Sequence, residues 1–441
     1  MLLSHAPGYF KKRRDQLMAA EPSAAFIFAS SLEVLRNPDV EHPFRQESNF
    51  YYLCGFPEPE SFLILAPGGS KPGSSYRTIM FVRRRDPEKE IWEGERYGVD
   101  GALRVFGVDE AYPIDEFDRR LPELLRGSDK MYFRLGQDER TDRRVLASLE
   151  TVRRTQGRSG KSLNPIGDPN ELIGEMRLFK SPEEIELLRQ ACRISAEGHK
   201  RAMREARPGM NEYEVEALID YSFRRKGCGR LGYGSIVAGG RNSTCLHYRA
   251  NNETLKEGDL LLIDAGGEFD YYTADITRTF PVGRSFSKPQ AALYGLVLKA
   301  QLEVLKIAKP GTVYSDLHKT ACEVLIDGLL SLGLLQGKSS EIFQSAGFRR
   351  FYPHGTGHWL GMDVHDVGMY EKNGESRRLE PGMVFTVEPG LYVQPGDLEA
   401  PEQYRNIGIR IEDNILVTSS GHENLTCDVP KGIAEIESLR S

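Results

Sequence analysis

The chain has 441 residues, which is enough for two or three domains of ordinary size. Its composition, 39% hydrophobic and 28% charged, is typical of a soluble globular protein. The formal net charge of −6 is spread along the chain, which argues against a nucleic-acid-binding surface, and no apolar run approaches the roughly 20 residues of a membrane span. The six cysteines are scattered without a C-x-x-C pair, as expected for free thiols in a reducing compartment. We therefore expect a cytoplasmic protein that binds neither nucleic acid nor membrane.

The first part of the chain alternates between apolar strand patterns and helical patterns, which predicts an α/β layer. The polar run 155–174, rich in Arg, Ser, Gly, Asn and Pro, predicts a connection to the next domain. We therefore expect one domain at 1–174 and a second at 175–441. The predicted strands of the first domain are 24–29, 62–66 and 78–82, and its predicted helices are 10–18, 115–126 and 138–151.

The second domain opens with a strong helix-start signal. Ser181 is a predicted N-cap, Pro182 occupies the first helical position, and Glu184 completes a capping box. Helices then alternate with antiparallel strands, which predicts an α+β domain with its helices on one face of the sheet. The predicted helices are 182–206, 212–226, 289–308 and 314–332, and the predicted strands are 235–237, 383–388, 391–393 and 407–417.

Residues 260–280 read as a β-hairpin with a Gly-containing connection. A turn centred between Phe269 and Asp270 places Asp264 directly opposite Asp275, with Cβ atoms roughly 4.5 to 5.5 Å apart. Two carboxylates that close repel each other and raise each other's pKa. Water, a shared proton or cations between the two groups would relieve this repulsion, and paired metal ions about 3.5 to 4 Å apart suit the spacing. A bend at the neighbouring glycine pair is the alternative.

Three of the nine histidines, His354, His358 and His365, fall within twelve residues. Glycines at 355, 357 and 361 disfavour a helix there, because each costs roughly 1 kcal/mol relative to alanine. The segment is therefore a predicted loop that presents imidazole groups usable as ligands or as acid–base groups. The alternative is a polar loop in which the histidines are incidental.

Two glutamates follow strand patterns near the C-terminus. Glu388 shares a strand face with Thr386, and on a buried face it would need a partner or a metal. Glu412 shares a face with Arg410, so a surface ion pair between them is its alternative interpretation. The four carboxylates of the whole set match two divalent cations, and oxygen-rich ligation favours ions such as Mn²⁺. The candidate ligands are Asp264, Asp275, His358, Glu388 and Glu412.

Four segments of the second domain resemble the dinuclear-metal peptidases of the pita-bread fold, and most closely the bacterial Xaa-Pro aminopeptidase (aminopeptidase P) family. These segments are LLIDAGGEFDYYTADITRTFPV, HGTGHWLGMDVHD, VEPGLY and NIGIRIEDN. In the first domain, the stretches NPDV and FRQESNFYYLCGF resemble the N-terminal domain of that family. The resemblance implies an N-terminal α/β domain with a role in oligomerisation or substrate gating, followed by a pita-bread catalytic domain.

The same resemblance implies roles for the site residues. The five candidate ligands hold two divalent ions, with Asp275 and Glu412 bridging both. Glu388 also handles protons, and His365 stabilises the developing oxyanion or orients the substrate. The catalytic set is thus His365, Glu388 and His354, and the substrate-binding set is His247, His354, His365 and Arg410. Alternatively, His354 and His365 brace the loop through hydrogen bonds.

The implied reaction is release of the N-terminal residue from a peptide with proline in second place, by attack of a metal-bridging hydroxide. The implied cofactors are two divalent ions, foremost Mn²⁺, and the implied assembly is a homodimer or homotetramer. Trp92 could reach the active site of a neighbouring subunit, although a buried structural tryptophan is the favoured interpretation.

Three other functions remain open. An Xaa-Pro dipeptidase shares the fold and ligands, but needs a feature that caps the substrate carboxylate, and none is identified in the sequence. A non-catalytic peptide-binding module and a metal-free creatinase-like amidinohydrolase are the others. Both are disfavoured because all five ligand positions are intact.

Overall fold

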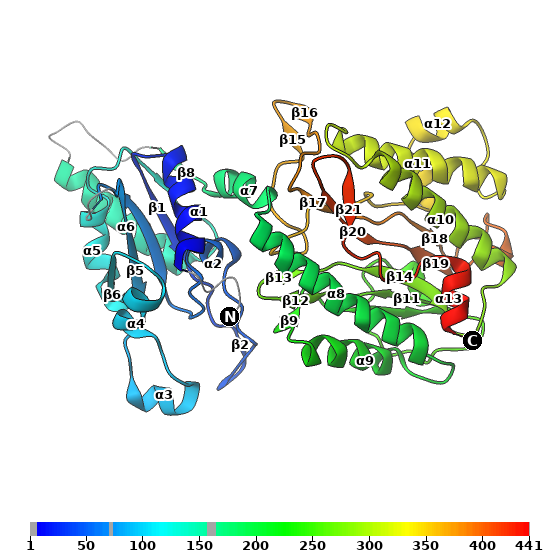
Figure 1. Ribbon diagram of the computed structural model, residues 1–441, viewed down its shortest axis with the longest axis horizontal. Coiled ribbons are helices and arrows are strands. Elements are labelled where there is room, and N and C mark those ends of the chain that lie inside the picture. Colours follow the sequence, from blue (N-terminus) through cyan, green and yellow to red (C-terminus); the bar gives the residue numbers. More distant parts are fainter. Residues whose placement is uncertain (1–6, 70–73, 157–164, 441) are drawn as a thin grey trace. The chain divides into compact units, whose positions relative to one another are not determined.

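The computed structural model describes residues 7–69, 74–156 and 165–440. The chain divides into two compact units, Met1–Met176 and Arg177–Ser441 (Figure 1). Within the described ranges, no helix is long and apolar enough to cross a membrane. Helix α7 (Asn170–Leu178) spans the boundary between the units.

The first unit is built on a six-stranded mixed sheet. Strand β4 is antiparallel to β1 and β5, while the outer pairs β5–β6, β1–β7 and β7–β8 are parallel. The three predicted strands are confirmed as β1, β4 and β5, and their side chains are almost entirely buried. In sheet order, the strands are β6 (Glu110–Pro113), β5 (Tyr76–Val82), β4 (Phe62–Pro67), β1 (Ala24–Ala29), β7 (Lys130–Tyr132) and β8 (Ile166–Gly167).

Helices of this unit pack around the sheet, and the three predicted helices are present. The predicted helix 115–126 begins as a short 3-10 turn before it becomes α-helical. The helices are α1 (Pro7–Ala20), α2 (Ser48–Cys54), α3 (Pro87–Glu93), α4 (Gly98–Val105), η2 (Ile114–Glu116), α5 (Phe117–Leu124) and α6 (Glu139–Gln156); strands β2 (Leu35–Asn37) and β3 (Val40–Glu41) form a separate hairpin.

The structure changes two expectations for this unit. Residues 155–174 are only partly a connection, because β8 pairs with β7 through backbone hydrogen bonds and α7 begins at Asn170; residues 157–164 lie outside the described residues. Trp92 is not a buried structural tryptophan, since 88% of it is exposed. Helix α3, which carries Trp92, has no buried residue. The Asp86 side chain caps the N-terminus of this helix by accepting a hydrogen bond from the Lys89 backbone.

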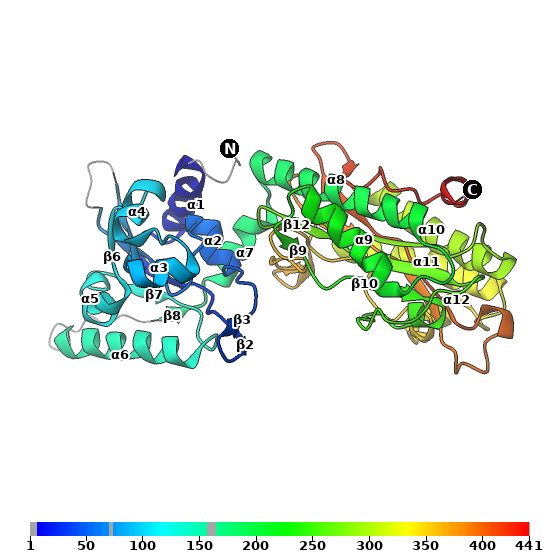
Figure 2. The same ribbon diagram turned by 90° about the horizontal axis from the view of Figure 1, so that it is seen from below.

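The second unit contains the long helices α8, α9, α10 and α11 and several short strand pairs (Figures 1 and 2). Helix α8 starts as predicted, because Ser181 accepts a hydrogen bond from the Glu184 backbone and the Glu184 side chain accepts one from Ser181. Helix α8 packs against α9, and α10 packs against α11. The helices are α8 (Pro182–Glu205), α9 (Glu212–Arg225), η3 (Gly240–Thr244), α10 (Lys288–Ile307), α11 (Tyr314–Ser331), α12 (Ser339–Gln344), η4 (Gly347–Arg350), η5 (Glu402–Tyr404) and α13 (Ile433–Leu439).

The strands of this unit pair as β10-β11-β14, β13-β12-β9, β17-β20-β21, β18-β19 and β15-β16. They are β9 (Arg230–Leu231), β10 (Ile236–Gly239), β11 (Leu260–Asp264), β12 (Gly267–Phe269), β13 (Tyr272–Thr273), β14 (Thr277–Pro281), β15 (Glu371–Lys372), β16 (Glu375–Ser376), β17 (Val384–Val387), β18 (Gly390–Val393), β19 (Ile407–Arg410), β20 (Asp413–Val417) and β21 (His422–Asn424).

The hairpin 260–280 forms, but its predicted register is wrong by two residues. Asp264 pairs with Thr277, not with Asp275. The tight turn is at Asp270 and Tyr271, whose φ angles of 47° and 70° are both positive, as a type I′ hairpin turn requires. A turn centred there leaves the two aspartates as diagonal neighbours on one sheet face instead of a directly opposed pair.

The predicted single strand 407–417 is also wrong, because it is split into β19 and β20. The first pairs with β18, and the second pairs with β17 and β21. The split at Ile411 and Glu412 lets one stretch of chain join two ladders. It also frees Glu412 from strand pairing, and its backbone N–H donates to the Thr277 carbonyl of β14 instead.

Strand alternation separates a core face from a site face. Leu261 and Ile263 belong to the main hydrophobic core, which also includes side chains of α8 to α11. Leu262, between them, packs in a small cluster on the other face with Ile236 and Tyr392. Asp264 continues the Leu262 face, so the helices cover one face and the acidic residues point from the other.

Candidate metal centre

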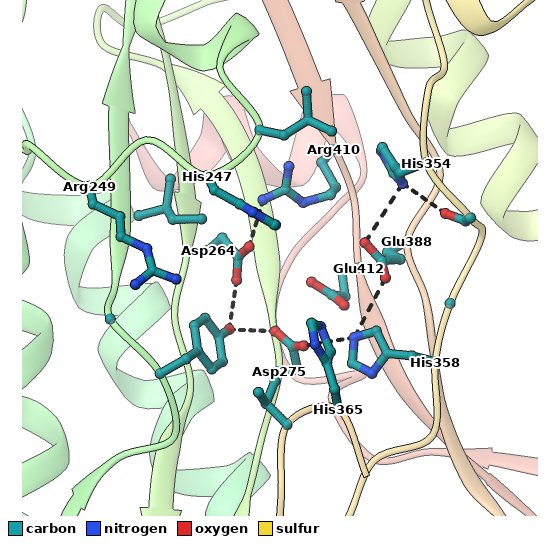
Figure 3. Close-up of a pocket in the computed structure, with 17 residues that line it drawn as sticks. His247, Arg249, Asp264, Asp275, His354, His358, His365, Glu388, Arg410 and Glu412 are labelled. Carbon is teal, nitrogen blue, oxygen red and sulfur yellow. Dashed lines mark hydrogen bonds and ion pairs between the residues drawn. The ribbon is translucent and has the colours of Figure 1, made fainter. Parts of the chain in front are cut away.

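All of the predicted site residues border one cavity of about 400 Å³ in the second unit (Figure 3). Asp264 at the end of β11 and Asp275 in the segment before β14 contribute carboxylates from one side, and the 354–365 loop contributes imidazoles from the other. The predicted residues are Asp264, Asp275, His358, Glu388 and Glu412, together with His247, His354, His365 and Arg410.

The two aspartates of the hairpin are linked by one hydroxyl group. The Tyr233 hydroxyl lies 2.6 Å from Asp264 Oδ1 and also contacts Asp275 Oδ1. The second oxygen of Asp264 accepts from Arg410 at 2.6 Å. The backbone of Asp275 is fixed in turn, because its N–H donates to the Asn414 side chain over 3.0 Å. Both carboxylates are therefore held on the site face despite the shifted register.

Strand β17 positions the histidine loop. The backbone N–H of Thr386 donates to the His358 carbonyl, and that of Glu388 donates to the Thr356 carbonyl. The irregular histidine loop is therefore hydrogen-bonded alongside this strand. His358 Nε2 then lies 3.2 Å from Asp275 Oδ2 and 3.6 Å from Glu388 Oε1. The loop is not helical, as its glycines predicted.

Glu412 completes the group from the break between β19 and β20. It is 1% exposed, so the surface ion pair with Arg410 is wrong, and Arg410 pairs with Asp264 instead. One carboxylate oxygen of Glu412 accepts from Thr277 Oγ1 at 2.8 Å, whereas its Oε1 is buried without a hydrogen-bond partner. Ligand atoms of Asp275, His358 and Glu412 all lie within 4.8 Å of one another.

These acids are crowded in a site with few compensating charges. Burial, and then the neighbouring carboxylates, raise the pKa of Asp275 and raise that of Glu412 well above its usual value. Burial raises the pKa of Glu388 to about 7, although His358 and Arg410 oppose the shift. Burial alone would lower the pKa of His358, but the hydrogen bond that its ring donates to Asp275 and the nearby carboxylates raise it to about 9. The site therefore attracts positive charge.

The residues present fit divalent cations. A buried carboxylate oxygen without a hydrogen-bond donor, such as Glu412 Oε1, lowers the free energy of unfolding unless a bound group from outside the chain contacts it. The donor set consists of four carboxylates and one imidazole, which suits oxygen-preferring divalent ions and not the thiolate sites of structural zinc. The structure brings Asp275, His358 and Glu412 into one cluster, while Asp264 and Glu388 flank it through Tyr233 and His358 respectively.

His354 belongs to a chain of donors beside the acids. Arg410 donates to the Tyr392 hydroxyl over 2.9 Å, and that hydroxyl lies 2.9 Å from His354 Nε2. The other ring nitrogen of His354 lies 2.7 Å from the Gly355 carbonyl oxygen, so it carries the proton. Burial and then Arg410 lower the pKa of His354 to about 3, which keeps the ring neutral.

The remaining two histidines lie at the exposed side of the cavity. The rings of His365 and His358 meet edge-on with centroids 4.4 Å apart. Burial and then His358 lower the pKa of His365. His247 projects from the loop that follows η3 and lines the same cavity (Figure 3).

Among the polar side chains that sequence reasoning missed are Tyr233 and Arg249, which line the cavity, and Tyr392, which bonds to His354 and Arg410. Tyr392 lies within the VEPGLY segment, four residues beyond Glu388, so strand alternation from that glutamate could have placed it. Arg249 lies two residues beyond His247 in an irregular loop, so only its closeness in sequence to that histidine could have indicated it. Tyr233 follows a glycine-rich loop and carries no local signal, because its partners lie 31 and 42 residues away.

The sequence matches two family models. One is "Metallopeptidase family M24" over residues 186–419, and the other is "Aminopeptidase P, N-terminal domain" over residues 10–132. The chain is 44% identical over 432 residues to Xaa-Pro aminopeptidase of Escherichia coli, and the match covers 98% of this chain and 97% of that protein.

Solved structures agree over nearly the whole length. Aminopeptidase PepP of Pseudomonas aeruginosa matches with a TM-score of 0.94 and 45% identity, over 99% of this chain and 98% of that one. Zinc-substituted Escherichia coli aminopeptidase P in complex with product matches with a TM-score of 0.93 and 43% identity, again over 99% and 98%.

Proposed function

We propose, from the premise that this chain belongs to metallopeptidase family M24, that it is an Xaa-Pro aminopeptidase. In this reaction, the first residue is released from a peptide whose second residue is proline. The observation that supports the proposal most is the convergence of Asp275, His358 and Glu412 on one point, beside a buried carboxylate oxygen without a donor. The near-complete coverage of curated Xaa-Pro aminopeptidases favours this activity over a dipeptidase.

The proposed metal ligands are Asp264, Asp275, His358, Glu388 and Glu412, and the proposed ions are two Mn²⁺. Two divalent cations held there would supply a water activated for attack on the peptide carbonyl, together with positive charge for the free amine. The oxygen-rich donor set supports Mn²⁺, while the zinc-substituted relative indicates that the fold tolerates another divalent ion.

Glu388 and His365 are the proposed proton-handling and carbonyl-stabilising residues. Glu388 borders the cavity at the edge of the ligand cluster, with its Oε1 3.6 Å from His358 Nε2, so its carboxylate can accept a proton during attack and return it to the proline nitrogen. His365 lies beside His358 and has a lowered pKa, so its neutral ring can donate an N–H to the developing oxyanion.

Proline recognition is proposed for the wall formed by His354, Tyr392 and Arg410. An Xaa-Pro bond has no amide N–H, so a hydrogen-bond acceptor beside its nitrogen would add nothing to substrate affinity. The wall satisfies its own polar groups, because Arg410, Tyr392 and His354 bond to one another. It can therefore present ring surfaces to the pyrrolidine without leaving a buried group unpaired.

The proposal also covers the cellular compartment, the assembly and the role of the N-terminal domain. The six cysteines are free, which supports a reducing compartment such as the cytoplasm. A homodimer or homotetramer is proposed, in which the N-terminal domain at 1–174 takes part in assembly or in substrate gating. The exposed Trp92 and Ile91 of α3 are apolar groups that such an assembly would cover.

Peptide hydrolysis with and without Mn²⁺ tests the activity. The metal-loaded protein should cleave Xaa-Pro-Yaa tripeptides, with little turnover of Xaa-Pro dipeptides or of Xaa-Ala-Yaa peptides. A chelator should abolish cleavage and also lower the melting temperature, because a ligand at 100 times its Kd adds about 2.7 kcal/mol to the free energy of unfolding. Preferred cleavage of the dipeptide, or full activity without metal, would contradict the proposal.

A further inference from the structure

The cavity has a second wall, formed by Ile236, Leu246 and Arg249, together with Tyr233. Figure 3 shows Arg249 across the cavity from His354 and Glu388, with the aspartates between them. If proline occupies the side of His354, then the residue before proline faces this second wall. Its lining combines two aliphatic side chains with one cation.

Arg249 differs from Arg410, the other arginine of the cavity, in its hydrogen bonding. Arg410 is buried and donates to Asp264, Tyr392 and Thr277. Arg249 is exposed toward the cavity, and none of the residues that the structure describes forms a hydrogen bond or ion pair with its guanidinium. An arginine fork without a partner at a binding cavity is a ready site for a carboxylate, because it can donate two parallel hydrogen bonds.

The backbone that carries Arg249 is nevertheless firmly held on both sides. The fully buried carboxylate of Glu212 accepts from the Tyr248 hydroxyl at 2.8 Å and from the Glu253 backbone at 2.9 Å. Its other oxygen accepts from the Gly239 backbone at 2.7 Å and from the Asn242 side chain at 3.0 Å. Both oxygens of this acid therefore accept hydrogen bonds from the end of β10 and from the loop between β10 and β11.

Asn251 fixes the segment immediately beyond Arg249. Its side chain accepts from the Val237 backbone at 3.0 Å and donates to the Ser235 carbonyl at 2.9 Å. Its φ of 46° places it in the left-handed region, which Asn tolerates better than most residues. The loop therefore aims Arg249 from a fixed backbone, which lowers the entropic cost of using it as a binding group.

Charge in the loaded cavity favours the same use of Arg249. Without cations, four carboxylates would repel an acidic substrate. Two divalent cations would cancel those four charges and leave the positive charges of Arg410 and Arg249, of which Arg410 is buried and hydrogen-bonded to Asp264, Tyr392 and Thr277. The guanidinium of Arg249 would then be an uncompensated positive charge beside the entering peptide, which attracts negative groups.

We propose that Arg249 binds the side-chain carboxylate of the first substrate residue, so that the enzyme prefers peptides beginning Glu-Pro or Asp-Pro. This inference rests on the proposed function and names the substrate class of the same site. Leu246 and Ile236 contact the methylene groups of that side chain, and the guanidinium binds its carboxylate. Glu212 acts as a positioning residue for the loop, since it contacts no substrate.

The test compares Glu-Pro-Leu with its uncharged isostere Gln-Pro-Leu. The wild-type ratio of kcat/KM should favour the acid by about three- to tenfold, the range of a partly enclosed ion pair. Arg249→Met should bring the ratio to one or below, and Arg249→Lys should restore part of it. Raising the salt concentration from about 0.1 to about 1 M should shrink the wild-type ratio, because the screening length falls from about 10 to about 3 Å.

Two controls separate the possible outcomes. Arg284→Gln changes an exposed arginine outside the cavity and should leave the Glu-to-Gln ratio at its wild-type value. Comparing Gln-Pro-Leu with its C-terminal amide asks whether Arg249 binds the peptide terminus instead. A ratio near one in the wild type, a ratio that survives Arg249→Met, or a preference that follows the terminal carboxylate overturns the inference. If Ala-Pro-Leu is not cleaved by the metal-loaded wild type, the proposed function itself fails.

Discussion

Glu412 and Asp413 are consecutive, buried acids with opposite surroundings. Asp413 is 0% exposed and accepts from Arg278 at 2.7 Å, from Asn424 at 2.9 Å and from Thr426 at 2.9 Å, and it also binds Lys431. Glu412 is 1% exposed, yet one of its oxygens has no donor. Because consecutive residues in an extended chain point to opposite faces, one acid faces the core network and the other faces the cavity.

Their pKa values move in opposite directions for this reason. Burial would raise the pKa of Asp413, but Arg278 and Lys431 hold it far below its usual range. Burial raises the pKa of Glu412, and the carboxylates of Asp275 and Glu388 raise it further. An acid whose cations are part of the chain stabilises the fold, whereas an acid surrounded by other acids requires a cation from outside.

Of the changes that test this difference between Glu412 and Asp413, Glu412→Gln should have the largest effect. The proposed metal site would lose a bridging charge, and we expect kcat/KM to fall by about a thousandfold or more, since a metal contributes several kcal/mol to catalysis. The metal-free variant should be at least as stable as the metal-free wild type, because the amide removes like-charge repulsion. Enzyme kinetics, metal content and urea unfolding of the chelated proteins measure these effects. Retention of full turnover and metal content would show that Glu412 is no ligand.

The matched change at the neighbouring position is Asp413→Asn. It leaves Arg278 buried without its counter-ion, and breaking a buried ion pair in this way costs about 3 kcal/mol of unfolding free energy or more. Urea unfolding with and without Mn²⁺ should show the loss in both conditions, unlike the effect of Glu412→Gln. A loss confined to the metal-loaded protein would mean that Asp413 serves the metal site and not the fold.

The smallest effect per pH unit is a pH dependence of the free energy of unfolding, which should have opposite sign for Glu388 and for Asp413. The folded-state pKa of Glu388 is raised from 4.5 to about 7, so between these pH values the folded state binds more protons than the unfolded chain. The free energy of unfolding of the metal-free protein should therefore fall as pH rises through this window, by at most about 1.4 kcal/mol per pH unit for each proton. Asp413 has a lowered pKa, so its contribution should be lost as pH falls below its ordinary 3.8.

Denaturant unfolding of the chelated protein across this pH range measures both slopes. Glu388→Gln should flatten the slope between pH 4.5 and 7, and Asp413→Asn should reduce the loss in acid. A wild-type slope of the opposite sign in the upper window would contradict the assignment of crowded, raised carboxyl groups.

Local signals in the sequence predicted much of this molecule. The capping box at Ser181, the apolar strand runs and the glycine-rich histidine loop depend on neighbouring residues only, and they form as predicted. The candidate site residues also lie at one cavity, because their motifs fall at strand ends and in a loop. Their individual roles remain predictions.

Other features depend on tertiary contacts that no local pattern records. The hairpin register is set by Asp270 and Tyr271, which both adopt positive φ, although Phe-Asp-Tyr-Tyr is not a strong turn signal. The break between β19 and β20 requires two separate strand partners, β18 and β17. The exposure of Trp92 follows from a helix that no core covers, which contradicts the usual burial of tryptophan.

The long separation of the acidic residues along the chain has a consequence for biosynthesis. Asp264 and Glu412 are roughly 150 residues apart, which a ribosome adds in about 7 to 30 seconds. Until Asn414 has been made, the hydrogen bond that fixes the Asp275 backbone cannot form. If these acids hold the cation as proposed, it loads only after Asn414 has been made, and cells starved of divalent ions should accumulate intact but inactive protein.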